Sequence, residues 1–205
     1  LRGRHPGLPV IGVEPALRPA AALTHTGRVG VMATQGTLAS NKFTQLLASL
    51  DTQVEFVLQP CPGLAEAIER SVRPGAAGAA GLARMQALCT QYVAAMGNFG
   101  TWPGEMDVLV LGCTHYIFAE SALRDLVGPD VELVETGVAV ARRTRALLQR
   151  QALLRRNQAD DKLQLLATGD VGVLNAAAVR WLTGKPHAWP VSGARHLPLA
   201  TAQTG

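Results

Sequence analysis

Short apolar runs alternate with longer amphipathic stretches along most of the chain. The apolar runs predict six strands, at residues 8–13, 27–34, 54–60, 108–111, 131–134 and 163–168. A run that is apolar at every position, such as 108–111, is typical of a strand buried on both faces of a parallel sheet. Strands that alternate with helices predict an α/β fold with mainly parallel sheets.

Amphipathic periodicity predicts the helices between these strands. They are expected near residues 20–23, 40–50, 64–71, 82–96, 119–127, 138–154 and 174–182. Residues 73–81 are rich in glycine and alanine, so a loop is expected there. The tail from Lys185 contains three prolines and is expected to be loose.

The most distinctive segment is the run 108–111 together with the residues GCTHY that follow it at 112–116. In open α/β sheets the reactive groups lie just beyond the carboxyl ends of the strands. Gly112 is expected to allow a tight turn and the close approach of a small molecule. Cys113 and His115 form a candidate acid–base pair, because a nearby imidazolium or helix N-terminus lowers the pKa of a thiol. The segment therefore predicts part of an active site.

Two earlier strand ends also carry polar or thiol groups. Thr34 and Thr37 follow the strand at 27–34, and Cys61 follows the strand at 54–60 between two prolines. The carboxyl ends of parallel strands lie at one edge of a sheet, so these groups could line one cleft with Cys113. For the two threonines, a turn or a helix N-cap is an equally good interpretation. Cys61 is interpreted as a small buried residue.

Three other residues have plainer interpretations. Glu69 is first of all a surface carboxylate of the helix at 64–71, and Cys89 is a core residue of the helix at 82–96. Glu14 either caps the helix that follows it or faces the cleft, and the sequence leaves both possibilities open.

Composition and charge argue against several classes of protein. Three widely spaced cysteines, without a CxxC pair, argue against a disulfide framework and a structural zinc site. The formal charge of +4 comes largely from arginines at 142–156, which are typical of a solvated helix face. No nucleic-acid-binding motif accompanies them, so nucleic-acid binding is not expected. No apolar stretch reaches the roughly 18 residues of a membrane span, and the first residues do not form a signal peptide.

The GCTHY segment resembles the second catalytic motif of glutamate racemase, within the aspartate/glutamate racemase superfamily. Further matches follow in the family's order: GVEPA at 12–16, ATQGT at 33–37, CP at 61–62 with Glu69 seven residues on, and LVETG at 133–137. The resemblance implies two similar α/β domains that face each other across the active-site cleft. It assigns residues 1–25 and 137–205 to the first domain, which is incomplete in this sequence, and residues 26–136 to the second.

The resemblance also implies a reaction, the interconversion of L-glutamate and D-glutamate without a cofactor or metal. In that family one cysteine thiolate removes the α-proton, and a second cysteine thiol reprotonates the carbanion from the opposite face. Cys113 would be the base that acts on L-glutamate, assisted by His115. Thr114, His115, Thr37 and Thr34 would bind the substrate, and Glu69 matches a family carboxylate near the cleft.

The family's other catalytic cysteine lies in a Cys-Asn-Thr motif that precedes the GVEPA segment. Leu1 lies only thirteen residues before Glu14, so we expect this motif to lie outside the sequence and the chain alone to be inactive. The resemblance further implies a homodimer in a bacterial cytoplasm, where D-glutamate supports peptidoglycan synthesis and cell shape. Aspartate racemase is the nearest alternative, and a non-catalytic amino-acid-binding relative is the alternative from another class.

Overall fold

The computed structural model describes residues 3–50, 53–154, 163–182 and 191–196 of the 205-residue chain. Within these ranges helices and strands alternate, as the sequence predicts. In chain order the elements are α1 (Leu17–Leu23), β1 (Arg28–Ala33), α2 (Gln35–Leu38), α3 (Asn41–Ala48), β2 (Glu55–Pro60), α4 (Leu64–Ser71), α5 (Gly75–Met96), β3 (Val108–Leu111), the 3₁₀ helix η1 (Tyr116–Ala119), α6 (Glu120–Val127), β4 (Glu132–Val134), α7 (Gly137–Arg150), β5 (Leu163–Ala167), α8 (Val171–Leu182) and β6 (Val191–His196).

The main sheet contains four parallel strands in the order β2-β1-β3-β4. In the central strand β1, Val31 lies opposite Leu58 of β2 and Val110 of β3. Every residue of β3 is buried, as its uninterrupted apolar run predicts. The predicted α/β fold with mainly parallel strands is confirmed.

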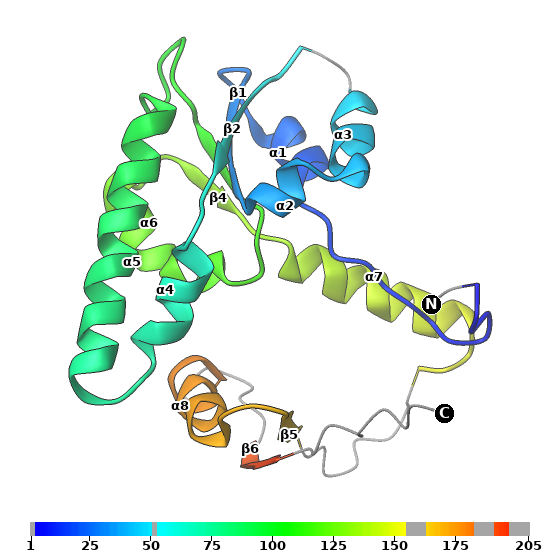
Figure 1. Cartoon of the computed structure of the whole chain (residues 1–205). Helices are drawn as coiled ribbons and strands as arrows, with labels where there is room; N and C mark the ends of the chain where they lie inside the picture. The colour runs from blue at the N-terminus through cyan, green and yellow to red at the C-terminus, as the bar shows by residue number, and fades with distance from the viewer. Residues whose placement is uncertain (1–2, 51–52, 155–162, 183–190, 197–205) are drawn as a thin grey trace.

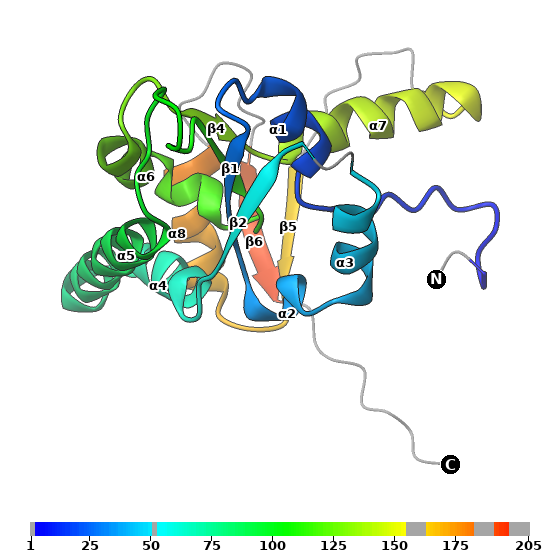
Figure 2. The same ribbon diagram turned by 90° about the horizontal axis from the view of Figure 1, so that it is seen from above.

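Alternate residues of β3 point into two separate cores. Leu109 and Leu111 belong to the core formed with α4, α5 and α6, whereas Val108 and Val110 belong to the core formed with α1 and α3. Figures 1 and 2 show these two groups of helices on opposite sides of the main sheet. Because both faces of the sheet are covered by apolar cores, polar functional groups are left to the strand ends.

The prediction of a loop at residues 73–81 is wrong. The helix α5 begins at Gly75 and continues without a break through this segment. A side chain at Gly81 would place its Cβ 2.6 Å from backbone atoms of Arg70 and Ser71 at the end of α4. The glycine that suggests a loop therefore allows two helices to approach closely, a tertiary effect that the local sequence does not reveal.

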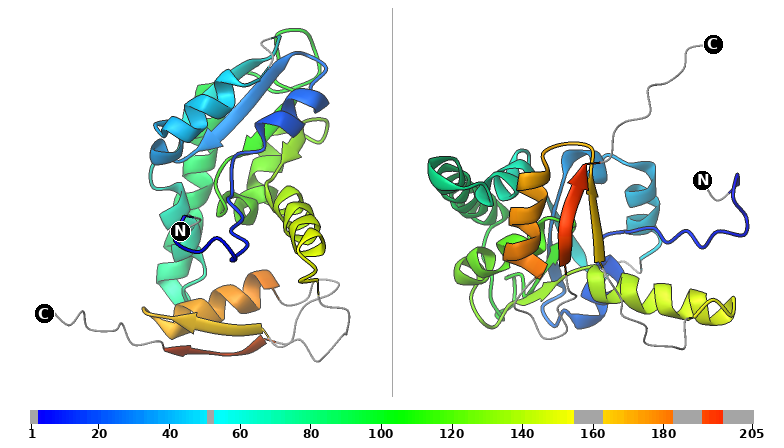
Figure 3. Two further views of the ribbon diagram at one scale, coloured as in Figure 1. Left: turned by 90° about the vertical axis from the view of Figure 1, so that its right-hand side faces the viewer. Right: turned by 90° about the horizontal axis from the view of Figure 1, so that it is seen from below.

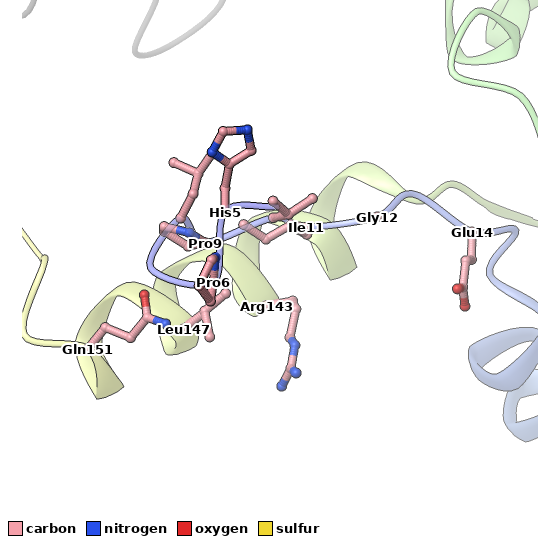
Figure 4. Close-up of a pocket in the computed structure, with 11 residues that line it drawn as sticks. His5, Pro6, Pro9, Ile11, Gly12, Glu14, Arg143, Leu147 and Gln151 are labelled. Atoms are coloured by element: carbon pink, nitrogen blue, oxygen red, sulfur yellow. The ribbon is translucent and has the colours of Figure 1, made fainter. Parts of the chain in front are cut away.

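The prediction of a buried strand at residues 8–13 is also wrong. Leu8 and Val13 are 57% and 54% exposed, and no strand in the described part of the chain pairs with this segment. Pro9 lacks an N–H to donate to a neighbouring strand. The segment instead runs beside α7, with which it lines a cavity (Figure 4).

Two boundaries near the C-terminus differ from the predictions. Residues 191–196, predicted to be loose, form β6, because pairing with β5 outweighs the weak local signal. The other residues of the tail from Lys185 lie outside the described residues. The helix α7 ends at Arg150 rather than at residue 154, and Ala152 then adopts a positive φ of 56°, which is incompatible with a continuing helix.

A second sheet, formed by the parallel pair β5 and β6, lies with α8 beyond the carboxyl ends of the main sheet (Figures 1 and 3). In α8, Trp181 stacks on Phe118 of η1, with ring centroids 4.0 Å apart and 12° between the ring planes. Arg180 donates a hydrogen bond of 3.0 Å to the carbonyl of Ser71 in α4. The division into domains at residues 1–25 with 137–205 and 26–136 stays a prediction.

The buried carboxylate of Asp107 fixes the connection between α1 and β1. It accepts hydrogen bonds from the hydroxyls of Thr24 and Thr26, at 2.5 and 3.0 Å, and from the N–H groups of His25 and Thr26, at 2.6 and 3.1 Å. Burial alone would raise the pKa of Asp107, but these hydrogen bonds outweigh it and lower the pKa. Asp107 thereby joins the start of β1 to the start of β3.

Candidate active site

The strand β3 delivers Cys113 to the edge of the main sheet. The N–H of Gly112 donates to the carbonyl of Met32 in β1 at 2.8 Å. A Cβ at Gly112 would lie 2.8 Å from that oxygen and 3.0 Å from the Cβ of Ala33. Gly112 does not adopt a positive φ. Its glycine is therefore needed for the close approach of β1 and β3, and the turn that follows is closed by the N–H of Tyr116, which donates to the carbonyl of Cys113 at 3.1 Å.

Cys113, His115 and Glu69 form a chain of three polar groups. The Nδ1 atom of His115 lies 3.7 Å from the Sγ atom of Cys113, and its Nε2 atom lies 2.7 Å from the Oε1 atom of Glu69. In the tautomer whose Nε2 donates to the carboxylate of Glu69, Nδ1 is left to accept a hydrogen bond from the thiol. Such a chain combines a nucleophile, a base and a group that orients the base.

A cavity of about 200 Å³ lies beside the thiol. Three of the predicted site residues line it, namely Cys113, Thr114 and Thr37. Its volume is below the roughly 300–1,000 Å³ of sites for drug-sized ligands, so it suits a small molecule. His115 and Glu69 do not line this cavity but another, of about 680 Å³, between α4, η1 and α8. The imidazole of His115 thus bridges the thiol at one cavity and the carboxylate at the other.

The two predicted threonines have different roles in the structure. Thr34 is the N-cap of α2, because its Oγ1 accepts a hydrogen bond of 3.1 Å from the N–H of Thr37. Thr34 is not among the residues that line either cavity. Thr37 lines the smaller cavity, and its hydroxyl lies 2.8 Å from the hydroxyl of Thr34. The contact with Thr34 therefore orients the hydroxyl of Thr37.

Two further polar residues line the cavity beside Cys113. Glu14, for which the sequence left a capping position and the cleft open, is placed at the cavity. Thr136 was not predicted as a site residue, although it follows β4 by two positions. The same rule that points to Cys113, chemistry beyond the carboxyl end of a parallel strand, would have pointed to Thr136.

The other two cysteines are core residues, as the sequence predicts. Cys61 is 2% exposed and Cys89 is fully buried. Burial raises the pKa of Cys61 to about 12 and that of Cys89 to about 11, because a thiolate is poorly solvated in an apolar core. Both thiols are therefore protonated at neutral pH, and neither is placed to act as a base.

A third cavity, of about 580 Å³, lies between the N-terminal segment and α7 (Figure 4). Arg143 and Leu147 of α7, with Gln151 just after the helix, line one side of it, and Glu14 lies at the end nearest the rest of the chain. It contains no cysteine and none of the predicted site residues. The chemistry of the candidate site is therefore confined to the edge of the main sheet.

Within the described ranges, no group of three His, Cys, Asp or Glu side chains is placed to hold a metal ion. Likewise, none of the helices described combines the length and apolar content needed to cross a membrane.

Most of the sequence is similar to that of known proteins. The sequence is 42% identical over 176 residues to the glutamate racemase of Ectopseudomonas mendocina, a match that covers 86% of this chain and 62% of that protein. The chain is a homologue of the glutamate racemases. The chain spans less than two thirds of the length of the curated racemases it matches. No family model matches the sequence.

Solved racemase structures share the fold of this homologue. The glutamate racemase isoform RacE1 of Bacillus anthracis superimposes with a TM-score of 0.71 at 29% identity, over 95% of this chain and 67% of that one. The Escherichia coli glutamate racemase gives a TM-score of 0.71 at 23% identity, over 97% of this chain and 69% of that one. The resemblance stated from the GCTHY segment is therefore confirmed at the level of homology and fold. The roles of the individual site residues stay predictions.

Proposed function

We propose that this chain supplies one half of the active site of a glutamate racemase, which interconverts L-glutamate and D-glutamate without a cofactor. The observation that carries the proposal is the chain of Cys113, His115 and Glu69 at the edge of a small cavity. A thiol within reach of an oriented imidazole is suited to moving a proton, which is all that racemisation requires.

In the proposed reaction Cys113 is the base that acts on L-glutamate. Its own proton passes to Nδ1 of His115, and the thiolate then takes the α-proton while the electron pair of the Cα–H bond stays on the substrate as a carbanion. Hydrogen-bond donors around the α-carboxylate stabilise this carbanion. A second thiol on the opposite face gives its proton to the carbanion, which inverts the carbon centre. Cys113 ends protonated and the second thiol ends as a thiolate.

The second thiol is proposed to lie outside these 205 residues. Cys61 and Cys89 are buried and have raised pKa values, so neither exchanges a proton readily with a substrate. A single thiol on one face cannot invert a carbon centre efficiently. The 205 residues alone are therefore expected not to racemise glutamate.

Glutamate is the proposed substrate because the curated homologues are glutamate racemases. The E. coli racemase, which shares this fold, was solved with L-glutamate and an activator, UDP-MurNAc-Ala. Thr114 and Thr37 line the cavity and offer hydroxyl groups to the charged ends of an amino acid. Thr34 supports Thr37 through the contact between their hydroxyls.

The wider setting follows from the same proposal. D-glutamate made by such an enzyme would enter peptidoglycan and so affect cell shape, in a bacterial cytoplasm. A homodimer is proposed on the resemblance alone.

The complete gene product tests the proposal. Circular dichroism of L-glutamate and of D-glutamate should decay to zero with enzyme, and ¹H NMR in D₂O should show loss of the α-proton signal from both enantiomers. L-aspartate should stay unchanged. The proposal fails if neither glutamate enantiomer exchanges its α-proton, and exchange of aspartate alone would assign the chain to the aspartate racemases.

A further inference from the structure

The helix α8 contacts α4, which carries Glu69, and η1, which begins directly after His115. Trp181 stacks on Phe118 of η1, and Arg180 donates to the carbonyl of Ser71 in α4. These two side chains are neighbours in the sequence, so a single turn of α8 touches both elements. Besides these contacts, Trp181 packs against the core that includes α4, α5 and α6.

Each contact lies close to one member of the pair. Phe118 follows His115 by three residues, and its N–H donates to the carbonyl of His115 at 3.0 Å. Ser71 follows Glu69 by two residues within the last turn of α4. A shift of Phe118 therefore moves the backbone of His115, and a shift of Ser71 moves the backbone of Glu69.

The pair itself is poorly held by burial. The side chains of His115 and Glu69 are 33% and 60% exposed, so water competes for their hydrogen bond. A polar contact at such an exposed position gains little energy by itself and loses side-chain entropy when it forms. Its geometry of 2.7 Å between Nε2 and Oε1 must therefore be imposed by the two backbones that carry the side chains.

Other charged groups surround the pair. Asp170, just before α8, lines the same cavity of about 680 Å³ as His115 and Glu69. Glu66 and Arg70 of α4, and Arg73 just after it, line an adjacent cavity together with Glu69. Arg180 is engaged with the backbone of Ser71 rather than with a carboxylate in the described structure.

We propose that α8 is a positioning element for the acid–base chain, with Trp181 and Arg180 as positioning residues that hold the imidazole of His115 against the carboxylate of Glu69. Held there, the carboxylate fixes the hydrogen on Nε2 and leaves Nδ1 to accept the proton of Cys113. Without this support the imidazole rotates or changes tautomer, and the thiol of Cys113 loses the base that would take its proton. The expected loss of catalysis rests on the proposed racemase function, whereas the expected change in the reactivity of the Cys113 thiol does not.

The test uses the complete gene product and measures the rate at which iodoacetamide alkylates Cys113 between pH 5 and 9. Mass spectrometry of the peptide that contains Cys113 separates this thiol from every other cysteine. Trp181→Leu removes the stacked ring and keeps an apolar side chain, whereas Trp181→Phe keeps a ring. Leu182→Ala, at an exposed position of the same helix, is the matched control.

Trp181→Leu should lower the alkylation rate at pH 7 about tenfold and move the pH profile to higher pH, because the imidazole of His115 is then less often placed to take the proton of Cys113. The value of kcat for glutamate should fall by a similar factor while KM changes little, because α8 does not line the cavity beside Cys113. Trp181→Phe and Leu182→Ala should keep the wild-type profile. Arg180→Met, which leaves the aromatic stack intact, should act in the same direction as Trp181→Leu, with rescue by Arg180→Lys.

A double-mutant cycle shows whether the effect passes through Glu69. In a Glu69→Ala background, which removes the acceptor of the Nε2 hydrogen bond, Trp181→Leu should have almost no further effect on the alkylation profile. A wild-type profile in folded Trp181→Leu, or full additivity in the cycle, overturns the proposal. If Trp181→Leu fails to fold, as judged by circular dichroism, the two Arg180 variants decide the question. If the wild-type protein does not racemise glutamate while the alkylation results hold, the proposed function fails and the positioning role stands.

Discussion

Replacing Glu69 with glutamine isolates the charge of the carboxylate that faces His115. In the wild type, Oε1 of Glu69 lies 2.7 Å from Nε2 of His115. Glutamine has nearly the same shape as glutamate, and its amide oxygen still accepts a hydrogen bond from Nε2. Only the negative charge is lost. The negative charge of Glu69 stabilises the imidazolium that forms when His115 takes the proton of Cys113.

The size of the effect follows from the contact and its exposure. A hydrogen bond to a charged group contributes about 1.5–3 kcal/mol to stability, and a neutral one about 0.5–1.5 kcal/mol, so the charge adds about 1 kcal/mol. Glu69 is 60% exposed and His115 is 33% exposed, and solvent screening therefore favours the lower part of this range. Since 1.4 kcal/mol corresponds to a factor of ten, Glu69→Gln should lower kcat about three- to tenfold.

Initial rates from L-glutamate and from D-glutamate, followed by circular dichroism, give the measurement. The ratio kcat/KM must fall equally in both directions, because the two enantiomers have equal free energies. Glu66→Gln is the matched control, since Glu66 lies on the same helix and pairs at 3.6 Å with Arg70 rather than with His115. If Glu69→Gln and Glu66→Gln give the same rates, the carboxylate does not act through His115 and the reasoning is refuted.

Three other variants test separate parts of the structure. Cys113→Ser should reduce the rate of racemisation by more than about 10³-fold, because a hydroxyl exchanges its proton far less readily than a thiol. The circular dichroism spectrum of the protein should be unchanged. A normally active variant would remove Cys113 from the mechanism. Asp107→Asn should lower the free energy of unfolding by about 2 kcal/mol at pH 7, measured with urea. Because folding lowers the pKa of Asp107, its carboxylate stabilises the fold above the unfolded pKa of about 4, and this stabilisation is lost as pH falls through the folded pKa. The free energies of unfolding of the wild type and Asp107→Asn should therefore converge well below pH 4. A constant difference between these free energies down to pH 2 would contradict this account. Gly81→Ala should lower the melting temperature. The new Cβ would lie 2.6 Å from the backbone of Arg70, and the resulting strain of about 1–3 kcal/mol exceeds the gain in helix propensity of about 1 kcal/mol. A stabilised variant would show that α4 and α5 can separate at little cost.

Local patterns in the sequence predicted most of the fold. The strand before Gly112 and the helix α4 agree with the structure almost to the residue, because an apolar run and an amphipathic period each report burial directly. Where the predictions are wrong, the deciding interaction is distant in sequence. The glycine at 81 allows α5 to pack on α4, and β6 forms because β5 pairs with it.

The candidate site was predictable to a similar extent. Cys113 and His115 are two residues apart, so a single strand end reveals both. Glu69 lies 46 residues before His115, and from spacing alone it was a surface carboxylate that only the family resemblance connected to the cleft. Trp181 and Arg180 gave no signal in the sequence, because a stacked ring and a bond to a backbone carbonyl leave no spacing pattern.

The three cysteines show why the site lies at an edge of the sheet rather than within a core. Cys61 also follows a strand of the same parallel sheet, yet it is buried and its pKa is raised to about 12. A thiol in that position stays protonated at neutral pH and cannot serve as a base. Cys113 differs in two respects that its position provides, a cavity beside the sulfur and an imidazole 3.7 Å away. Such a site must remain partly open to admit substrate, so the orientation of its imidazole has to come from neighbouring elements rather than from burial. That requirement is the physical reason to look for positioning residues on α8, the helix that contacts both η1 and α4.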